Sequence, residues 1–264
     1  MARPAFLHLP ARPGKPRRIG LTHVLDKGAP AGVVDTYLAT VADYVDLWKL
    51  GWGTAYVAAN LGAKIELLAR HGVGACVGGT LLEVAWAQGE AEACLAWADA
   101  AGFSHVEVSN GVVGMPAGEV HRLIERAATS FVVLAEVGSK DPEAPVSADG
   151  WAAEAAADLD AGARWVLAEG RESGNVGLYR PDGHVREEVA GALVAAVGLE
   201  AVIFEAPRRE QQSWLVRSFG ANVNLGNVAL EEVCGLEALR LGLRADTVQS
   251  REQAGRPAGA PGGR

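Results

Sequence analysis

The sequence predicts a single (β/α)8 barrel, an α/β fold of the TIM type, and three observations carry this prediction. Eight short apolar segments recur along the chain, and each resembles a strand that is buried on both faces. A segment with helical periodicity follows each of them. The length of 264 residues suits one barrel domain. A doubly wound open sheet is the main alternative, but the count of eight and the even spacing favour a closed barrel.

The predicted elements alternate in order along the chain. The strands are residues 18–25, 44–50, 73–78, 105–109, 131–137, 164–170, 201–206 and 222–226. The helices have apolar residues at i, i+3 and i+4, and they cover residues 33–42, 63–71, 90–101, 117–128, 149–162, 186–198, 208–220 and 231–243. Several helices should end at a glycine that can adopt the left-handed conformation, namely Gly72, Gly102, Gly162, Gly198 and Gly220.

Composition indicates one folded domain between a flexible N-terminal arm and a disordered C-terminal tail. Hydrophobic residues make up 49% of the chain and charged residues 21%, which allows a large core and excludes global disorder. We expect residues 1–17, rich in proline and arginine, to be a flexible arm. Residues 18–248 should form the barrel that carries catalysis. Residues 249–264 are rich in glycine and proline and should be a disordered tail.

Charge and hydropathy exclude several classes of function. The net charge of −8 and the pI of about 5.3 argue against a nucleic-acid-binding surface, which needs clustered lysine and arginine. No apolar run is long enough to span a membrane, and the first residues lack a secretory apolar segment. The three cysteines form no C-x-x-C pair, so we expect free thiols. A cytoplasmic protein is therefore predicted.

Lysines are rare and unevenly distributed. The chain has five lysines against 19 arginines, and three of the five follow the predicted strands 1, 2 and 5: Lys27, Lys49 and Lys140. The carboxyl ends of barrel strands form the active-site face of this fold. Lysine can transfer a proton or form a Schiff base, whereas arginine stays protonated. We therefore predict that these lysines take part in chemistry, with simple ion pairing as the alternative.

Carboxylates form a second group at the same face. Glu107, Glu136, Glu169 and Glu205 lie near the ends of four neighbouring predicted strands. Buried carboxylates repel one another unless cations lie between them. Oxygen ligands of this kind suit Mg²⁺, and a metal-free lattice of ion pairs is the alternative. Zinc is disfavoured by the histidine spacing, and we expect His23 to be a hydrogen-bonded core histidine.

A third group could bind an anion. Arginines follow predicted strands 6 and 7, and glycine-rich turns with free backbone N–H groups precede two helices. Uncharged amide and hydroxyl groups lie on the same predicted rim. The candidate substrate-binding residues are Arg171, Arg208, Gly79, Thr80, Asn110, Asn224 and Asn227.

Eight strings at the predicted strand ends resemble the phosphosulfolactate synthase family. They are GLTHVLDKG (20–28), DLWKLGWGT (46–54), GGTLLEVA (78–85), EVSNG (107–111), EVGSKD (136–141), AEGRESGN (168–175), FEAPR (204–208) and NVNLGNV (222–228). The resemblance covers residues 18–245. It implies a (β/α)8 barrel that adds sulfite to phosphoenolpyruvate in a Mg²⁺-dependent reaction, giving (2R)-phospho-3-sulfolactate. It also implies a homo-oligomer, possibly a trimer.

The resemblance also assigns roles to the candidate residues. Lys140 would donate a proton to C2 of the substrate, because the resembling proteins carry a lysine there. Lys27 and Lys49 would hold phosphate or carboxylate, and Arg171 and Arg208 would bind sulfite or phosphate. The metal ligands would be Glu136 and Glu169 first, then Glu107 and Asp26.

Two other functions remain open on the sequence. The first is another barrel lyase or aldolase that acts on a phosphorylated keto acid, through a Schiff base at Lys140 or Lys49. The second is a non-catalytic, stress-associated relative that keeps the barrel. Retention of the strand-end lysines and glutamates argues against the second.

Overall fold

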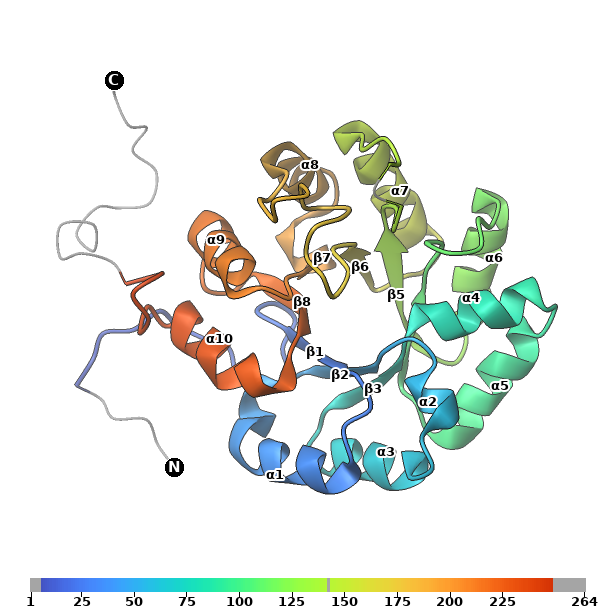
Figure 1. The fold of residues 1–264 in the computed structure, drawn as a ribbon, viewed down its shortest axis with the longest axis horizontal. Coiled ribbons are helices and arrows are strands. Elements are labelled where there is room, and N and C mark those ends of the chain that lie inside the picture. The colour runs from blue at the N-terminus through green and yellow to red at the C-terminus, as the bar shows by residue number, and fades with distance from the viewer. Residues whose placement is uncertain (1–5, 142, 249–264) are drawn as a thin grey trace.

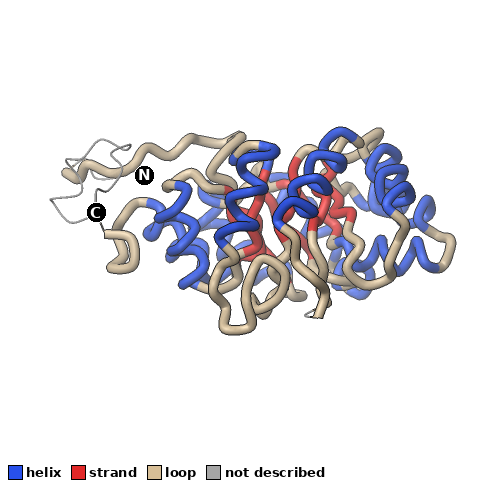
Figure 2. The backbone as a smooth tube through the Cα atoms, turned by 90° about the horizontal axis from the view of Figure 1, so that it is seen from above, coloured by secondary structure: helices blue, strands red, loops and turns tan. Residues whose placement is uncertain are grey.

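Eight parallel strands close into one barrel in chain order, from β1 beside β2 round to β8 beside β1. The computed structural model describes residues 6–141 and 143–248. Helices surround the strands (Figure 1), and the strands lie between helices on either side when the molecule is turned (Figure 2). The strands are β1 (Thr22–Asp26), β2 (Leu47–Leu50), β3 (Gly74–Val77), β4 (His105–Val108), β5 (Val132–Val137), β6 (Trp165–Ala168), β7 (Val202–Glu205) and β8 (Asn224–Val228). The predicted single (β/α)8 barrel is confirmed.

Ten α-helices and three short 3₁₀ helices connect these strands in the described chain. The α-helices are α1 (Ala31–Val41), α2 (Thr54–Val57), α3 (Leu61–Arg70), α4 (Gly79–Ala87), α5 (Ala91–Ala101), α6 (Ala117–Ala127), α7 (Ala148–Asp160), α8 (Glu187–Val197), α9 (Arg209–Phe219) and α10 (Val233–Arg240). The 3₁₀ helices are η1 (Ala42–Tyr44), η2 (Leu199–Ala201) and η3 (Leu230–Glu232). The sequence pattern does not predict helices α2 and α4, because their residues fall in the segments that it assigns to the loops after strands 2 and 3.

Each outer helix packs an apolar stripe against the barrel. On α1 the buried residues are Val34, Leu38 and Val41, spaced by one helical turn. The hydroxyl of Ser147 accepts a hydrogen bond from the Gly150 N–H and caps the start of α7. At the end of α5, Gly102 has φ of 89°, the left-handed conformation that the sequence predicted there. These local signals fix where helices begin and end around the barrel.

Alternate residues along each strand face the barrel axis. In β2, Leu47 belongs to the interior cluster and Lys49 lines the mouth, while Trp48 between them packs in the outer core. The interior cluster fills the barrel below its mouth and consists of Leu21, Leu47, Cys76, Leu134, Trp165, Leu167 and Ile203. Inward-facing residues at the carboxyl ends of the strands therefore lie above an apolar plug and meet at one pocket.

The N-terminal arm is anchored to the opposite end of the barrel. Arg12 pairs with Glu237 at 3.3 Å, and Arg17 pairs with Asp46 at 3.1 Å; all four side chains are at least nine-tenths buried. The prediction of a flexible arm over residues 1–17 is therefore wrong for Arg12 and Arg17, whose side chains are held by these ion pairs. The guanidinium groups fix the arm because they bind carboxylates of the barrel. The predicted tail, residues 249–264, lies outside the described residues.

Among the helices of residues 6–141 and 143–248, none is long and apolar enough to cross a membrane.

Asp158 on α7 should make stability depend on pH. Burial and then the charge of Glu154 raise the pKa of Asp158 from 3.8 to about 7. The unfolded chain loses this proton at lower pH, so stability present at acid pH is lost as the pH rises to 7. Asp158→Asn cannot ionise and should be more stable than the wild type at pH 8 by about 1–2 kcal/mol. Urea denaturation at pH 8 and pH 5 measures the difference, which should shrink at pH 5.

A variant on the same helix controls for a general charge effect. Asp160 is exposed, and Asp160→Asn should leave stability unchanged at both pH values. The half-buried His121 lies 3.5 Å from the Asp158 carboxylate, and in the described chain it is the only basic side chain within ion-pair distance of that group. A destabilised Asp158→Asn at pH 8 would mean that the pair with His121 outweighs the cost of burying the charge.

Candidate active site

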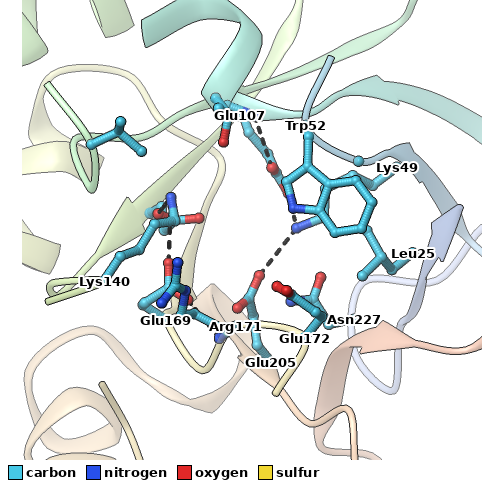
Figure 3. Close-up of a pocket in the computed structure, with 15 residues that line it drawn as sticks. Leu25, Lys49, Trp52, Glu107, Lys140, Glu169, Arg171, Glu172, Glu205 and Asn227 are labelled. Atoms are coloured by element: carbon cyan, nitrogen blue, oxygen red, sulfur yellow. Dashed lines mark hydrogen bonds and ion pairs between the residues drawn. The ribbon is translucent and has the colours of Figure 1, made fainter. Parts of the chain in front are cut away.

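One pocket opens at the carboxyl ends of the strands, where the sequence predicted the chemistry. Its volume is about 200 Å³, which suits a small ligand. Figure 3 shows charged side chains from several strands and loops converging on it. The lining residues are Leu25, Lys49, Gly51, Trp52, Gly79, Thr80, Glu107, Val112, Glu136, Lys140, Glu169, Arg171, Glu172, Glu205 and Asn227.

Lys49 lies between two glutamates on one side of the pocket. Its Nζ is 2.9 Å from Glu107 and 3.1 Å from Glu205, and all three side chains are buried. Burial alone would lower the pKa of Lys49, but the negative charges of Glu107, Glu205 and Glu136 raise it well above the ordinary value. Lys49 is therefore a fixed positive charge that points into the pocket (Figure 3).

Lys140 holds a similar position on the other side. Its Nζ lies 2.5 Å from Glu136, 3.5 Å from Glu169 and 3.7 Å from Glu83, and its side chain is 16% exposed. Burial opposes the charge, but Glu136 and Glu169 raise the pKa of Lys140 above the ordinary lysine value. Lys49 belongs to a strand, whereas Lys140 lies in the loop just after β5. The Lys140 side chain remains partly exposed at the pocket.

Buried carboxylates outnumber these ammonium groups. Five glutamates lie within this network against two lysines: Glu83, Glu107, Glu136, Glu169 and Glu205. Burial and then the Glu136 charge raise the pKa of Glu169 well above its ordinary value. An added cation would offset this excess and favour the carboxylate form of Glu169.

Three buried oxygen atoms lack a hydrogen bond within the described chain. They are Oε1 of Glu107, Oε2 of Glu169 and Oδ1 of Asn227, and all three residues line the pocket. The two glutamate oxygens still lie within ion-pair distance of Lys49 and Lys140. Buried polar atoms normally have a partner, so each is a site where a ligand is expected. Carboxylate and amide oxygens are ligands that Mg²⁺ binds. These oxygen atoms of the pocket therefore fit that ion.

Backbone strain gathers at the same pocket. In the described ranges, three non-glycine residues have positive φ: Trp52 at 52°, Arg171 at 53° and Asn227 at 51°. All three line the pocket. Such conformations cost free energy and persist where the surrounding structure enforces them, commonly at functional sites. Figure 3 shows the side chains of Asn227 and Arg171 at the pocket.

Helix α4 begins at the pocket wall. Its first residue, Gly79, donates its N–H to Glu107 at 3.1 Å, and Thr80 follows on the lining. A Cβ at Gly79 would lie 2.3 Å from the Ser109 hydroxyl, so only glycine fits this contact. The helix N-terminus contributes a positive partial charge to this side of the pocket.

Nine of the predicted site residues meet at the pocket. They are Lys49, Lys140, Glu107, Glu136, Glu169, Gly79, Thr80, Arg171 and Asn227. They come from strands 2, 4, 5 and 8, from the loops after strands 5 and 6, and from the start of α4 after strand 3, so the barrel brings together residues that are distant in sequence.

Hydrogen bonds within the protein exclude two residues from the roles predicted for them. Asp26, predicted as a metal ligand, faces outward from β1 and accepts four hydrogen bonds, including those of Trp48 and Lys64. No oxygen lone pair is left for a metal. Asn224, predicted to bind substrate, lies at the amino-terminal end of β8, where its side chain bonds Leu21 N–H and three carbonyl groups. Asn224 holds backbone together instead.

Three further residues do not reach the pocket. Lys27 is exposed on the loop after β1. Arg208 is exposed and lines a separate groove with Trp214. The amide of Asn110 is occupied by both backbone groups of Met115. Their predicted roles depended on how loops fold over the barrel, and these loops direct the three side chains elsewhere.

His23 is buried in the barrel interior, as predicted, but it is not hydrogen-bonded. Neither ring nitrogen has a hydrogen-bond partner in the described chain, and Nε2 lies 3.7 Å from Glu107. Burial and the charge of Lys49 lower the pKa of His23 well below its ordinary value. A neutral imidazole thus lies beneath the charged network.

Sequence reasoning missed three residues at the site: Glu83, Trp52 and Glu172. Glu83 is fully buried on α4, while Trp52 and Glu172 lie in loops. The string GGTLLE places Glu83 one helical turn after Gly79, which was the available signal. A helix that begins at Gly79 places Glu83 on the same buried face as Gly79.

Solved structures of other barrels resemble this chain in fold. The 3-hexulose-6-phosphate synthase of Salmonella typhimurium superposes with a TM-score of 0.57 at 13% identity, covering 85% of this chain and all (100%) of that one. The YdjI aldolase of Escherichia coli K12 gives 0.52 at 13% identity, covering 81% and 76%. At this identity the likeness concerns the fold alone.

Sequence comparisons are closer and cover nearly the whole chain. A family model described as "(2R)-phospho-3-sulfolactate synthase (ComA)" matches residues 10–246. The phosphosulfolactate synthase of Methanothermobacter thermautotrophicus is 40% identical over 245 residues, covering 90% of this chain and 95% of that protein. The Bacillus subtilis protein of the same name is 36% identical over 244 residues, covering 91% and 97%. The chain therefore belongs to the phosphosulfolactate synthase family.

Proposed function

We propose that the protein catalyses the Mg²⁺-dependent addition of sulfite to phosphoenolpyruvate, giving (2R)-phospho-3-sulfolactate. The observation that carries this proposal is the pocket itself. Two fixed ammonium groups face each other across a rim of carboxylates, in a chain that belongs to this family. Both substrates are anions, and positive charge in an otherwise acidic protein must be local to attract them.

The proposed reaction needs one new bond and one proton. The sulfur lone pair of sulfite forms a bond to C3, and the C2–C3 π electrons move to C2 and into the adjacent carboxylate. Lys140 donates its ammonium proton to C2, which completes the addition with no leaving group. Lys49 and Arg171 hold the anionic groups, because Lys49 is fixed and the Arg171 guanidinium makes no ion pair in the described chain.

Glu136 and Glu169 would hold the Mg²⁺, with Glu107 nearby. The fit rests on Oε2 of Glu169, which has no hydrogen bond in the described chain, and on the excess of buried carboxylates. When bound, the ion would supply positive charge where the substrate carboxylate gains electron density. Glu136 and Glu169 also orient Lys140, because its ammonium group pairs with both carboxylates.

Glu169→Gln should weaken Mg²⁺ binding by about tenfold or more, because it removes a charged oxygen donor. Isothermal titration of the protein with MgCl₂, without substrates, measures the affinity. Glu172→Gln is the matched control, since Glu172 lines the pocket but is exposed, and its affinity should stay at the wild-type value. Equal affinity in Glu169→Gln and wild type would remove Glu169 from the metal site.

An omission assay tests the proposed reaction. Phosphoenolpyruvate should be consumed only when the protein, sulfite and Mg²⁺ are all present. The Schiff-base alternative needs a neutral amine, but Lys49 and Lys140 are both held as ammonium groups by glutamates. Borohydride with phosphoenolpyruvate should therefore leave the protein unlabelled. Absence of phosphoenolpyruvate binding at millimolar concentration would instead support a non-catalytic role.

A homo-oligomer, trimeric by the family resemblance, is part of the proposal. Light scattering coupled to gel filtration would report the mass of the assembly.

A further inference from the structure

Glu83 is a fully buried carboxylate that holds the segment after β4. Its side chain is 0% exposed on α4. Its oxygens accept hydrogen bonds from the N–H groups of Gly111 at 3.3 Å, Val112 at 2.7 Å and Val113 at 3.2 Å, and from the Ser109 hydroxyl. Four donors from five consecutive residues therefore converge on one anion.

The same segment forms the wall beside Lys140. A Cβ added at Gly111 would lie 2.4 Å from Cδ and 2.8 Å from Nζ of Lys140, so the backbone lies directly against the lysine side chain. Val112 is 60% exposed and lines the pocket. The Glu83 carboxylate is itself 3.7 Å from the Lys140 ammonium. The wall and the charge behind it together define where Lys140 can lie.

We propose that Glu83 is a positioning residue: by binding the 109–113 segment, it fixes the wall that holds the Lys140 side chain in the pocket. Glu83 does not line the pocket, so it acts through Lys140 rather than on substrate. The catalytic consequence rests on the proposed function, but the effect on Lys140 does not.

Only an ionised carboxylate suits this set of donors. A glutamate accepts hydrogen bonds at both oxygens, whereas a glutamine would direct its NH₂ group either at the N–H groups of Val112 and Val113 or at the Gly111 N–H and the Ser109 hydroxyl, which can turn to accept. At least one N–H group would then lose its buried acceptor, which costs free energy and releases the segment. The nearby Asn110 cannot replace this anchor, because its amide is already used by Met115.

Selective acylation of lysine tests the proposal without needing activity. The wild-type chain, Glu83→Gln and the control Glu90→Gln are treated with acetic anhydride at one pH, and mass spectrometry compares acetylation of Lys140 with that of exposed Lys27. Glu90 is exposed, so its substitution removes a similar charge without touching the wall. We expect the Lys140/Lys27 ratio to rise several-fold in Glu83→Gln and to be unchanged in Glu90→Gln.

Kinetics of the same variants separate positioning from a structural role. Misplacement of Lys140 should lower kcat of Glu83→Gln by about 10- to 100-fold, while KM for phosphoenolpyruvate changes little. An unchanged Lys140/Lys27 ratio overturns the proposal, even if the variant is less stable or less active. A raised ratio in a protein that never consumes phosphoenolpyruvate supports the positioning role and contradicts the proposed function alone.

Gly111→Ala keeps the proposal testable if Glu83→Gln fails to fold. The added methyl group meets the Lys140 side chain directly and leaves the buried carboxylate intact. It should raise the acetylation ratio of Lys140 in the same direction. Normal labelling and normal kcat in Gly111→Ala would show that the wall does not control Lys140, and would contradict the proposal.

Discussion

Replacing Lys140 with alanine is expected to lower kcat for sulfite addition by about 10³-fold, because the variant loses its proton donor. The substitution also leaves Glu136 and Glu169 without their ammonium partner, which weakens binding of anions. Steady-state kinetics with phosphoenolpyruvate as the varied substrate measures both effects. Circular dichroism should show an unchanged fold, since Lys140 lies in a loop at the mouth and not in the core.

Two variants make this result specific. Lys27→Ala removes a lysine that the structure leaves exposed, and it should keep wild-type kcat. Lys140→Arg restores the positive charge beside Glu136, but its planar guanidinium does not place a proton where the compact Lys140 ammonium group does. Its kcat should therefore stay about 100-fold or more below wild type. A Lys140→Ala enzyme with nearly normal kcat would exclude Lys140 as the proton donor.

Lys49→Met should have the largest effect on stability. Removing Lys49 leaves Glu107 and Glu205 buried without a compensating charge. Breaking a buried ion pair by removing one partner costs about 3–5 kcal/mol in the free energy of unfolding. Urea denaturation at pH 8 measures this difference.

The double variant Lys49→Met with Glu205→Gln tests the cause. Neutralising Glu205 removes one of the two unpaired charges, so the double variant should be more stable than Lys49→Met by about 1–2 kcal/mol. A double variant that is less stable than Lys49→Met would show that Glu205 stabilises the barrel through another contact, such as its bond from the Gly170 N–H.

Most of the barrel could be predicted because strand and helix periodicities are local properties. The eight strands were found within a few residues, and the residues nearest their carboxyl ends follow the inward alternation. Glu136 lies two residues after the inward-facing Leu134, and Glu169 lies two after Leu167. Inward direction at the mouth is therefore readable from the sequence.

The errors at the site come from the same geometry. Leu25 lines the pocket, so the next residue, Asp26, must face outward toward Lys64 of α3. Asn224 lies at the start of its strand, far from the active-site face, and counting along β8 would have excluded it. These two errors could have been avoided by applying strand alternation and strand direction strictly.

Other features depend on tertiary structure that no local pattern gives. Lys27 and Arg208 lie in loops whose path is set by packing against the rest of the molecule. The sequence pattern does not predict Glu83 as a site residue. Its place follows from α4, which begins at Gly79 and packs the Glu83 side chain against the loop after β4. Asparagine adopts a positive φ more readily than most residues, but no local pattern places such a conformation at Asn227 within β8.

The most direct test of the proposed function is the structure of the product formed by the wild-type protein in D₂O. Phosphorus and proton NMR should show phosphoenolpyruvate converted, only with sulfite and Mg²⁺, into a phosphate ester that carries sulfonate on C3 and deuterium on C2. Unchanged phosphoenolpyruvate in the presence of folded protein, or a product without a carbon–sulfur bond, would contradict the function assigned to this pocket.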